Sequence, residues 1–112
     1  MVEARAYLPE RGDVVWLQFS PQSGHEQAGR RPALVLSPGA YNRRTGLGLL
    51  CPITSVVKGY AFEVPVNVGN VQGVVLSDQV RSLDWRARCA ERIGRVTDLT
   101  LQEVLTRVHT LV

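Results

Sequence analysis

The chain has 112 residues, of which 45% are hydrophobic and 21% charged, so it has the size and composition of one folded domain and not of a disordered chain. Its net charge is +3, and no apolar run approaches the roughly 20 residues that cross a bilayer, which excludes a membrane-spanning protein. The N-terminal residues lack the apolar centre of a secretory signal. We therefore expect a single domain over residues 1–112, located in the cytoplasm.

Cysteine, histidine and arginine usage narrows the chemistry that the chain can support. Cys51 and Cys89 are far apart and make neither a disulfide framework nor a zinc site, and Cys51 lies in an apolar run where we expect a buried thiol. Because His25 and His109 are the only histidines, we expect no zinc site. The sequence has no phosphate-binding loop and no dinucleotide fingerprint, and we expect no metal and no cofactor. Twelve of the 13 cationic residues are arginines, whose guanidinium suits phosphate, although codon bias in a GC-rich genome gives the same composition.

The first half of the chain predicts three strands, separated by a loop and by a turn or short helix. The first strand is a β-branched and aromatic run, and a loop that contains proline and glycine follows it. The second strand is apolar enough to be buried on both faces, and Pro52 in the third indicates an edge or an irregular end. In chain order these segments are residues 13–19, 20–30, 32–37, 38–46 and 47–53.

The second half of the chain predicts short strands followed by one helix. Apolar residues from Leu101 to Val112 recur at helical spacing and predict a helix over residues 98–111, with Thr97 or Asp98 as its N-cap. Several short strands with a terminal helix predict a small curled sheet, a β-barrel with helices outside. The segments before the helix are a loop at 54–59, a strand at 60–66, a turn at 67–73, one bent strand or two short strands at 73–76 and 78–83, and a strand end or connection at 84–90.

The segment from Gly24 to Pro32 is the densest cluster of candidate functional residues, with two glycines, a histidine, a carboxylate and paired arginines. Arg30 and Arg31 follow a glycine, where the backbone can approach a ligand closely. Paired guanidiniums suit a phosphate. The alternative is that one of the arginines pairs with Glu26 or Asp78 and only fixes the loop.

Further candidates lie near the predicted ends of strands. Thr54 either donates its hydroxyl to a phosphoryl oxygen or caps a turn, and Ser55 and Lys58 follow it. His25 is a candidate general acid or base, with solvated surface as the alternative. Phe19, at the end of the first strand, is the best candidate for stacking on a base. The other large aromatic side chains are expected in the core or a subunit interface: Trp16, Tyr60 and Trp85.

Short segments in a fixed order along the chain carry a resemblance to a known family. They are residues 11–14, 24–27, 29–32, 35–38, 41–42, 45–46, 52–54, 58–60, 62–64, 78–82 and 84–88. By their order and spacing the chain resembles the MazF/PemK/Kid toxins, small bacterial endoribonucleases of toxin–antitoxin pairs. The resemblance covers nearly the whole chain.

The resemblance implies a mainly β fold, an SH3-like small barrel of the CcdB/Kid/MazF type with a C-terminal helix and a short additional helix. It implies a homodimer with an RNA groove across the subunits, and a MazE-like antitoxin as partner. The implied function is that of a type II toxin, which cleaves single-stranded RNA at short sequence motifs without metal and so inhibits translation and growth. Attack of the ribose 2′-OH would give 2′,3′-cyclic phosphate and 5′-OH ends.

The resemblance also implies roles for individual residues. The family's catalytic arginine and threonine correspond to Arg31 and Thr54, its loop glutamate to Glu26, and the histidine and aspartate of Kid-like members to His25 and Asp78. The general base stays open among the last three. The residues expected to bind substrate are Phe19, Arg30, Ser55, Lys58, Gln79 and Arg86.

The chain departs from its relatives' patterns in two places, and a rival function remains. Arg30 stands where some MazF proteins have histidine, and Leu76 stands where Kid-like members have arginine. The sequence therefore mixes two subtypes. The alternative function is that of a CcdB-like toxin, which binds gyrase and has no nuclease activity.

Overall fold

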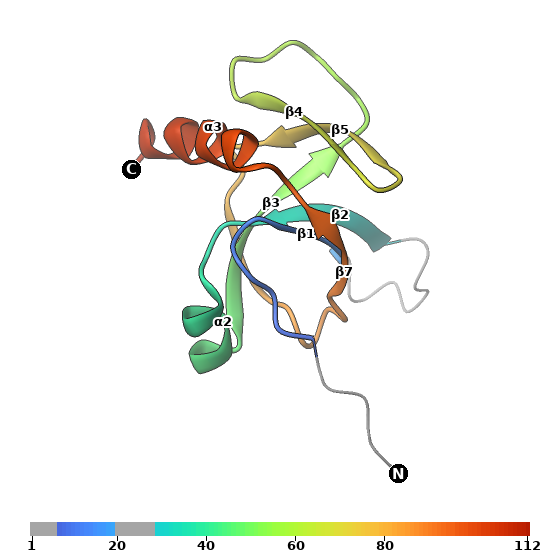
Figure 1. Ribbon diagram of the computed structural model, residues 1–112, viewed down its shortest axis with the longest axis vertical. Helices are drawn as coiled ribbons and strands as arrows, with labels where there is room; N and C mark the ends of the chain where they lie inside the picture. The colour runs from blue at the N-terminus through green and yellow to red at the C-terminus, as the bar shows by residue number, and fades with distance from the viewer. Residues whose placement is uncertain (1–6, 20–28) are drawn as a thin grey trace.

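The computed structural model describes residues 7–19 and 29–112, which form a strongly curled antiparallel sheet with two helices outside it (Figure 1). The expected mainly β fold, with a C-terminal helix and a short additional helix, is confirmed. The elements are β1 (Asp13–Gln18), β2 (Arg30–Val35), α2 (Gly39–Thr45), β3 (Leu47–Thr54), β4 (Glu63–Val68), β5 (Val71–Leu76), β6 (Arg81–Asp84), β7 (Glu91–Arg95) and α3 (Asp98–His109).

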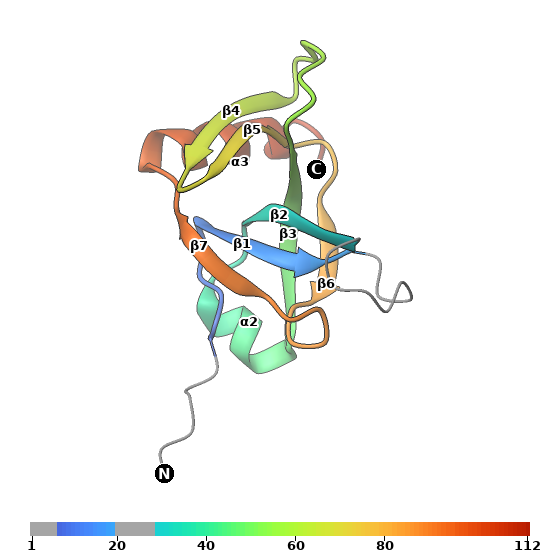
Figure 2. The same cartoon turned by 90° about the vertical axis from the view of Figure 1, so that its right-hand side faces the viewer.

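β3 joins the two halves of the sheet. The strand order is β4-β5-β3-β2-β1-β7, and β6 pairs with the first half of β3. On the edge of β3 away from β2, pairing with β6 ends at Leu50 and pairing with β5 begins at Ile53, so β3 changes neighbours within its length (Figure 2). This arrangement brings the end of β3 beside β5, where a site can form at the junction of the two halves.

Pro52 does not lie in an edge strand; it lies at the irregularity that the sequence offered as the alternative, where one edge of β3 changes its partner between Leu50 and Ile53. Pro52 pairs with Ala33 of β2 inside the sheet. The Leu36 N–H donates to the Leu49 carbonyl oxygen, so alternate residues of β3 direct their backbone groups to β2 and Pro52 directs its nitrogen to the other edge. There it faces the interval between β6 and β5, where the absent N–H costs no ladder hydrogen bond.

The two faces of the sheet bury separate apolar clusters. Successive residues of β1 and β2 enter different clusters, as period-two alternation requires, so the predicted burial of the second strand on both faces is confirmed. The first cluster contains Val14, Leu34 and the buried Cys51, and α3 closes it with Val104. The second cluster contains Val15, Leu17, Ala33, Val35, Leu50 and Leu83, and Phe19 packs against it.

The ends of the sheet approach each other and close the curl. A Cβ atom at Gly94 of β7 would lie 2.6 Å from the Val68 Cγ1 atom of β4, so only glycine allows the two strands to come this close. α3 lies against the β4–β5 hairpin, and α2 lies at the opposite end of the molecule beside the start of β3 (Figures 1 and 2). No helix among residues 7–19 and 29–112 is long and apolar enough to cross a membrane.

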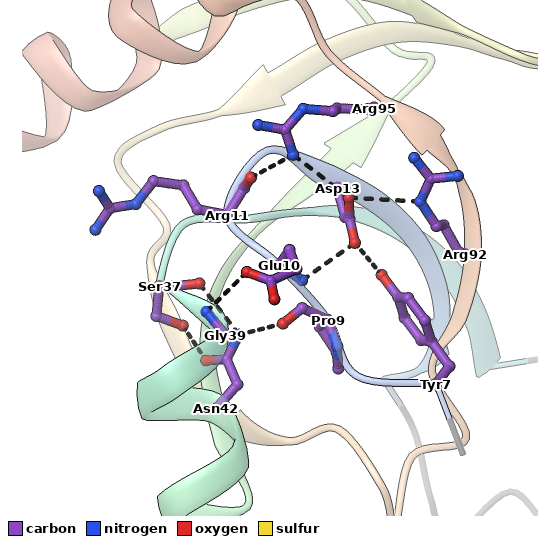
Figure 3. A network of polar contacts seen from close by, with 10 residues as sticks. All are labelled: Tyr7, Pro9, Glu10, Arg11, Asp13, Ser37, Gly39, Asn42, Arg92 and Arg95. Atoms are coloured by element: carbon purple, nitrogen blue, oxygen red, sulfur yellow. Dashed lines mark hydrogen bonds and ion pairs between the residues drawn. The ribbon is translucent and has the colours of Figure 1, made fainter. Parts of the chain in front are cut away.

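A polar network ties the segment before β1 to β7 and α2 (Figure 3). The buried Asp13 carboxylate accepts hydrogen bonds from the Tyr7 hydroxyl and the Glu10 N–H, and it lies 3.5 Å from Arg92 Nε and 3.7 Å from Arg95 Nη1. On the α2 side, the Asn42 side-chain amide donates to the carbonyl oxygens of Pro9 and Ser37. The contacts of Asp13 and those of Asn42 meet at the adjacent residues Pro9 and Glu10, as Figure 3 shows.

Several element boundaries differ from those predicted by the sequence. The strand expected at 60–66 begins at residue 63, and the turn expected at 67–73 shortens to two residues between β4 and β5. The segment 38–46, expected as a turn or a short helix, contains the helix α2 between its caps Pro38 and Gly46. The C-terminal helix has Thr97 and not Asp98 as its N-cap, because the Thr97 Oγ1 atom accepts the Thr100 N–H at 3.2 Å. β7 was not predicted at all.

Candidate functional site

A groove with two lobes opens where the end of β1, the start of β2 and the end of β3 meet β5 and the segment after it. The larger lobe has a volume of about 720 Å³ and the smaller about 340 Å³. Both are lined by Thr54, Val56, Leu76 and Gln79, so these residues form the neck between them. The predicted site residues Phe19, Arg30, Arg31 and Ser55 line the larger lobe, and Lys58 and Asp78 line the smaller one.

The two adjacent arginines differ in their surroundings. Arg30 Nη2 lies 2.6 Å from the Glu91 Oε1 atom of β7, so the charge of Arg30 is balanced by a carboxylate. Arg31 makes no ion pair within the described part of the chain; its Nη1 atom donates to the Arg30 carbonyl oxygen at 3.2 Å, and the side chain is exposed in the larger lobe. Of the two arginines, Arg30 is the one in an ion pair, and its partner is Glu91 and not Asp78. Glu26, the other expected partner, lies outside the described residues.

Thr54 ends β3 with its hydroxyl in the neck of the groove. The Thr54 Oγ1 atom accepts the Val56 N–H at 3.1 Å, which forms the turn that leaves the strand. A hydroxyl that accepts one hydrogen bond still has its own proton to donate. A Cβ atom at Gly73 of β5 would overlap the Thr54 carbonyl oxygen, so the glycine lets β5 hold the end of β3 in place. Thr54 therefore caps a turn and also presents a donor to the groove.

Glu63 organises the wall of the smaller lobe. Its carboxylate accepts the N–H groups of Lys58, at 3.1 Å, and Gly59, at 2.9 Å, and so closes the loop between β3 and β4. The smaller lobe is also lined by Tyr60, which is 62% exposed, so that of its two expected locations the subunit interface is left and the core is excluded. Asp78 lines the smaller lobe and not the larger one, whereas Arg31 lines the larger lobe and not the smaller one.

Cys51 lies behind the groove as a neutral thiol. Burial in the first cluster, with a smaller contribution from the negative charge of Asp78, raises the pKa of Cys51 to about 12. A thiol with this pKa is not a thiolate near neutral pH, so Cys51 is unsuited to be a nucleophile. The predicted buried thiol is confirmed.

Residues that the sequence analysis did not nominate also line the groove. Arg81, the first residue of β6, lies in the larger lobe with its guanidinium carbon 5.3 Å from the centroid of the Phe19 ring. Trp16 lines the same lobe while packing against the first cluster, so its core assignment is only half of its role. A signal for Arg81 existed in the sequence, because it falls in the segment 78–82 that carries Asp78.

Other candidates are not brought to the groove. Arg86 lines neither lobe; its guanidinium carbon lies 4.9 Å from the ring centroid of Trp85, which is buried as predicted. His25 and Glu26 lie outside the described residues. Among the described ranges 7–19 and 29–112, no group of three His, Cys, Asp or Glu side chains is placed to hold a metal ion.

The assembled groove combines cations, aromatic rings and hydrogen-bond donors. The larger lobe has the exposed guanidiniums of Arg31 and Arg81 beside the Thr54 hydroxyl. Guanidinium groups suit phosphate oxygens, and aromatic walls suit unstacked bases. The chemistry of the groove therefore fits a single-stranded polynucleotide.

Comparisons with known proteins agree on one family. The sequence model of a family described as "PemK-like, MazF-like toxin of type II toxin-antitoxin system" matches residues 10–112. The chain is 46% identical over 106 residues to the endoribonuclease toxin MazF of Escherichia coli strain K12. The match covers 95% of this chain and 96% of that protein. It is 47% identical over 109 residues to the endoribonuclease toxin ChpB of the same strain, with 92% and 93% covered.

Solved structures give the same result. The crystal structure of MazF from Deinococcus radiodurans superposes with a TM-score of 0.85 at 54% sequence identity, over 95% of this chain and 97% of that one. A MazE–MazF crystal structure from the same organism superposes with a TM-score of 0.84 at 49% identity, over 95% and 96% of the two chains.

Proposed function

The chain belongs to the PemK-like, MazF-like toxin family of type II toxin–antitoxin systems, and we propose that it is an endoribonuclease that cleaves single-stranded RNA in the two-lobed groove. The observation that carries the proposal is that Arg31 and Thr54 line the same lobe. The toxin acts in the cytoplasm on messenger RNA, and the loss of messages inhibits translation and growth.

The proposed reaction is attack of a ribose 2′-OH on the adjacent phosphorus. The bond to the 5′ oxygen of the next nucleotide breaks, which gives a 2′,3′-cyclic phosphate and a 5′-OH end. Because the nucleophile belongs to the substrate, alignment of the RNA backbone supplies much of the acceleration and no metal ion is required to generate a nucleophile. Arg31 stabilises the charge that grows on the phosphoryl oxygens, and Thr54 donates a hydrogen bond to one of them.

The proton that leaves the 2′-OH needs a base other than Arg31. An arginine, with a pKa above about 12, stays protonated and is a poor base near neutral pH. Asp78 lines only the smaller lobe, whereas Arg31 lines the larger one. Because the base must act at the phosphate that Arg31 contacts, this separation favours His25 or Glu26 for the role. Both residues lie shortly before Arg31 in the sequence.

Two kinds of protein partner belong to the proposal. We infer a homodimer in which grooves of the two subunits form one RNA path. We also infer a MazE-like antitoxin, since a relative from Deinococcus radiodurans has been solved with MazE. An acidic antitoxin segment that folds on binding would complement the arginines of the groove and compete with RNA.

The test incubates the purified protein with single-stranded RNA in EDTA. Cleavage with 5′-OH ends is expected, and a 2′-deoxy nucleotide at the cleavage site should block it. Arg31→Ala should lower the rate by roughly 10²- to 10³-fold, the usual effect of removing one charge-stabilising donor. Arg44→Ala, which removes a charge from α2 outside the groove, should cleave as the wild type does. Intact RNA together with gyrase inhibition would instead establish the CcdB-like alternative.

A further inference from the structure

The Phe19 ring in the larger lobe is covered by Arg81. The Arg81 guanidinium carbon lies over the ring, 5.3 Å from its centroid, which is the geometry of a cation–π contact. The Phe19 ring also packs against the second apolar cluster. A base inserted between ring and guanidinium would need about 7 Å, two layers of roughly 3.5 Å each. The observed separation of 5.3 Å is too small for a base between the two groups. In this arrangement the face of the Phe19 ring under Arg81 cannot stack on a base.

The backbone around Phe19 is held firmly in place. The Phe19 N–H donates to the Gly29 carbonyl oxygen at 2.8 Å, and Arg88 Nη1 donates to the carbonyl oxygens of Gln18, at 2.9 Å, and Phe19, at 3.1 Å. A fixed aromatic ring can hold a long side chain above it. The flexible Arg81 side chain thereby gains a defined position in the lobe.

Arg81 also supplies a charge that Arg30 does not. Arg30 is paired with Glu91, whereas Arg81 is exposed and makes no ion pair with any residue in the described ranges. Arg81 and Arg31 reach the same lobe from β6 and β2, which pair with opposite edges of β3. Two guanidiniums placed on either side of a strand can contact successive phosphates of one RNA strand.

We propose that Arg81 binds a backbone phosphate of the RNA, and that Phe19 is a positioning residue for Arg81 and not a platform for a base. The inference rests on the proposed function of the groove. Contacts to phosphates fix the register of a nucleic acid without reading its sequence. Arg81 would therefore hold the RNA so that the scissile phosphate reaches Arg31 and Thr54.

The test measures binding of a labelled 2′-O-methyl RNA oligonucleotide of mixed sequence, which cannot be cleaved by 2′-OH attack, at several salt concentrations. Each phosphate contact to a single strand contributes about 0.7 to the slope of log K against log salt. Arg81→Gln should weaken binding roughly three- to tenfold at low salt and make the slope shallower by about 0.7. Arg81→Lys should keep the wild-type slope. The matched control Arg44→Gln, which removes an equal charge from α2, should match the wild type.

The role of Phe19 is tested by Phe19→Leu, which keeps an apolar side chain against the cluster and removes the ring. This variant should also weaken binding and make the slope shallower, and adding it to Arg81→Gln should cause little further loss. If Phe19→Leu weakens binding at an unchanged slope and its effect multiplies with that of Arg81→Gln, Phe19 stacks on a base and the proposal is overturned. Circular dichroism confirms that each variant is folded.

The wild-type protein separates this inference from the proposed function. Failure to cleave unmodified RNA, with salt-dependent binding intact, counts against the proposed function alone. An unchanged slope in Arg81→Gln, with cleavage by the wild type intact, counts against the inference alone. Absence of any binding by the wild type overturns both.

Discussion

The turn-capping contact of Thr54 leaves room for the donor role that its sequence position suggested as the alternative. Its oxygen accepts the Val56 N–H, and this contact fixes the side chain at the neck of the groove. The proton of the same hydroxyl remains to donate. A side chain held by a backbone contact keeps its orientation without substrate, which is the preorganisation that charge stabilisation requires.

Replacement of Thr54 by valine tests this double role. Thr54→Val keeps the shape and removes both hydrogen bonds, so the cleavage rate should fall by about 10²-fold. Thr54→Ser keeps the hydroxyl and should retain most of the activity. Single-turnover cleavage of one RNA substrate measures both. Retained activity in Thr54→Val together with a loss in Thr54→Ser would show that the methyl group, and not the hydroxyl, matters.

The adjacent arginines show what single residues reveal from sequence alone. Arg30 and Arg31 are the same residue type in the same segment, and the sequence indicated only that one of them could be fixed by an ion pair. The partner proved to be Glu91, 61 residues away along the chain. No local pattern identifies such a partner, because β7 reaches Arg30 only after pairing with β1.

Among the elements, α3 follows from local signals and β7 does not. The apolar stripe of α3 has helical spacing, and Thr97 provides a local cap. β7 has the sequence Glu91-Arg-Ile-Gly-Arg95, which has neither a β-branched run nor clean alternation. It becomes a strand because it pairs with the edge of β1, a contact that hydrophobic patterning does not encode.

The cap of α3 gives a prediction at this scale. Thr97→Ala removes the side-chain oxygen that accepts the Thr100 N–H, so the free energy of unfolding should fall by about 1 kcal/mol. Thr106→Ala, at an exposed position inside the same helix, should change it by less than about 0.5 kcal/mol. Urea denaturation monitored by circular dichroism compares the two. Equal changes would mean that the cap contributes nothing to stability.

The stability of the whole molecule should depend on alkaline pH through its buried groups. Burial raises the pKa of Cys51 from 9.0 to about 12. Above pH 9 the unfolded chain therefore loses the thiol proton while the folded protein keeps it, and the free energy of unfolding falls with rising pH. Burial and the hydrogen bond to Asp13 also raise the pKa of Tyr7 above its usual value of 10.0, so its contribution of the same sign begins at higher pH.

Cys51→Ala isolates the thiol contribution between about pH 8 and 9.5, which lies below the usual tyrosine pKa of 10.0, so that Tyr7 contributes little. The wild type should lose about 1 kcal/mol over this interval, since one pKa unit corresponds to about 1.4 kcal/mol. Cys51→Ala should be less stable at pH 8 because of the lost core volume, but its stability should change less with pH. Urea midpoints under reducing conditions measure the stability of each protein and its slope against pH. A slope unaffected by Cys51→Ala would assign the effect to other groups.

The family, the enzyme class and the curled β fold could be expected from the sequence, and the comparisons confirm them. These features depend on local patterns and on the order of motifs, both of which can be read directly from the sequence. The residues of the candidate site could be predicted from the sequence only in part. Arg31, Thr54 and Gln79 were nominated and lie in the groove, while Arg81 and Trp16 were missed and Arg86 was nominated although it lines neither lobe.

The sequence by itself determined which residue types are present, where the chain alternates, and where the last helix begins. Only the tertiary structure decided that Arg30 is paired while Arg31 is exposed, that Asp78 and Arg31 line different lobes, and that Arg81 covers Phe19. The physical reason is that charge, stacking and access depend on distances across a curled sheet. Those distances are set by which strands pair, and strands that pair are often far apart along the chain.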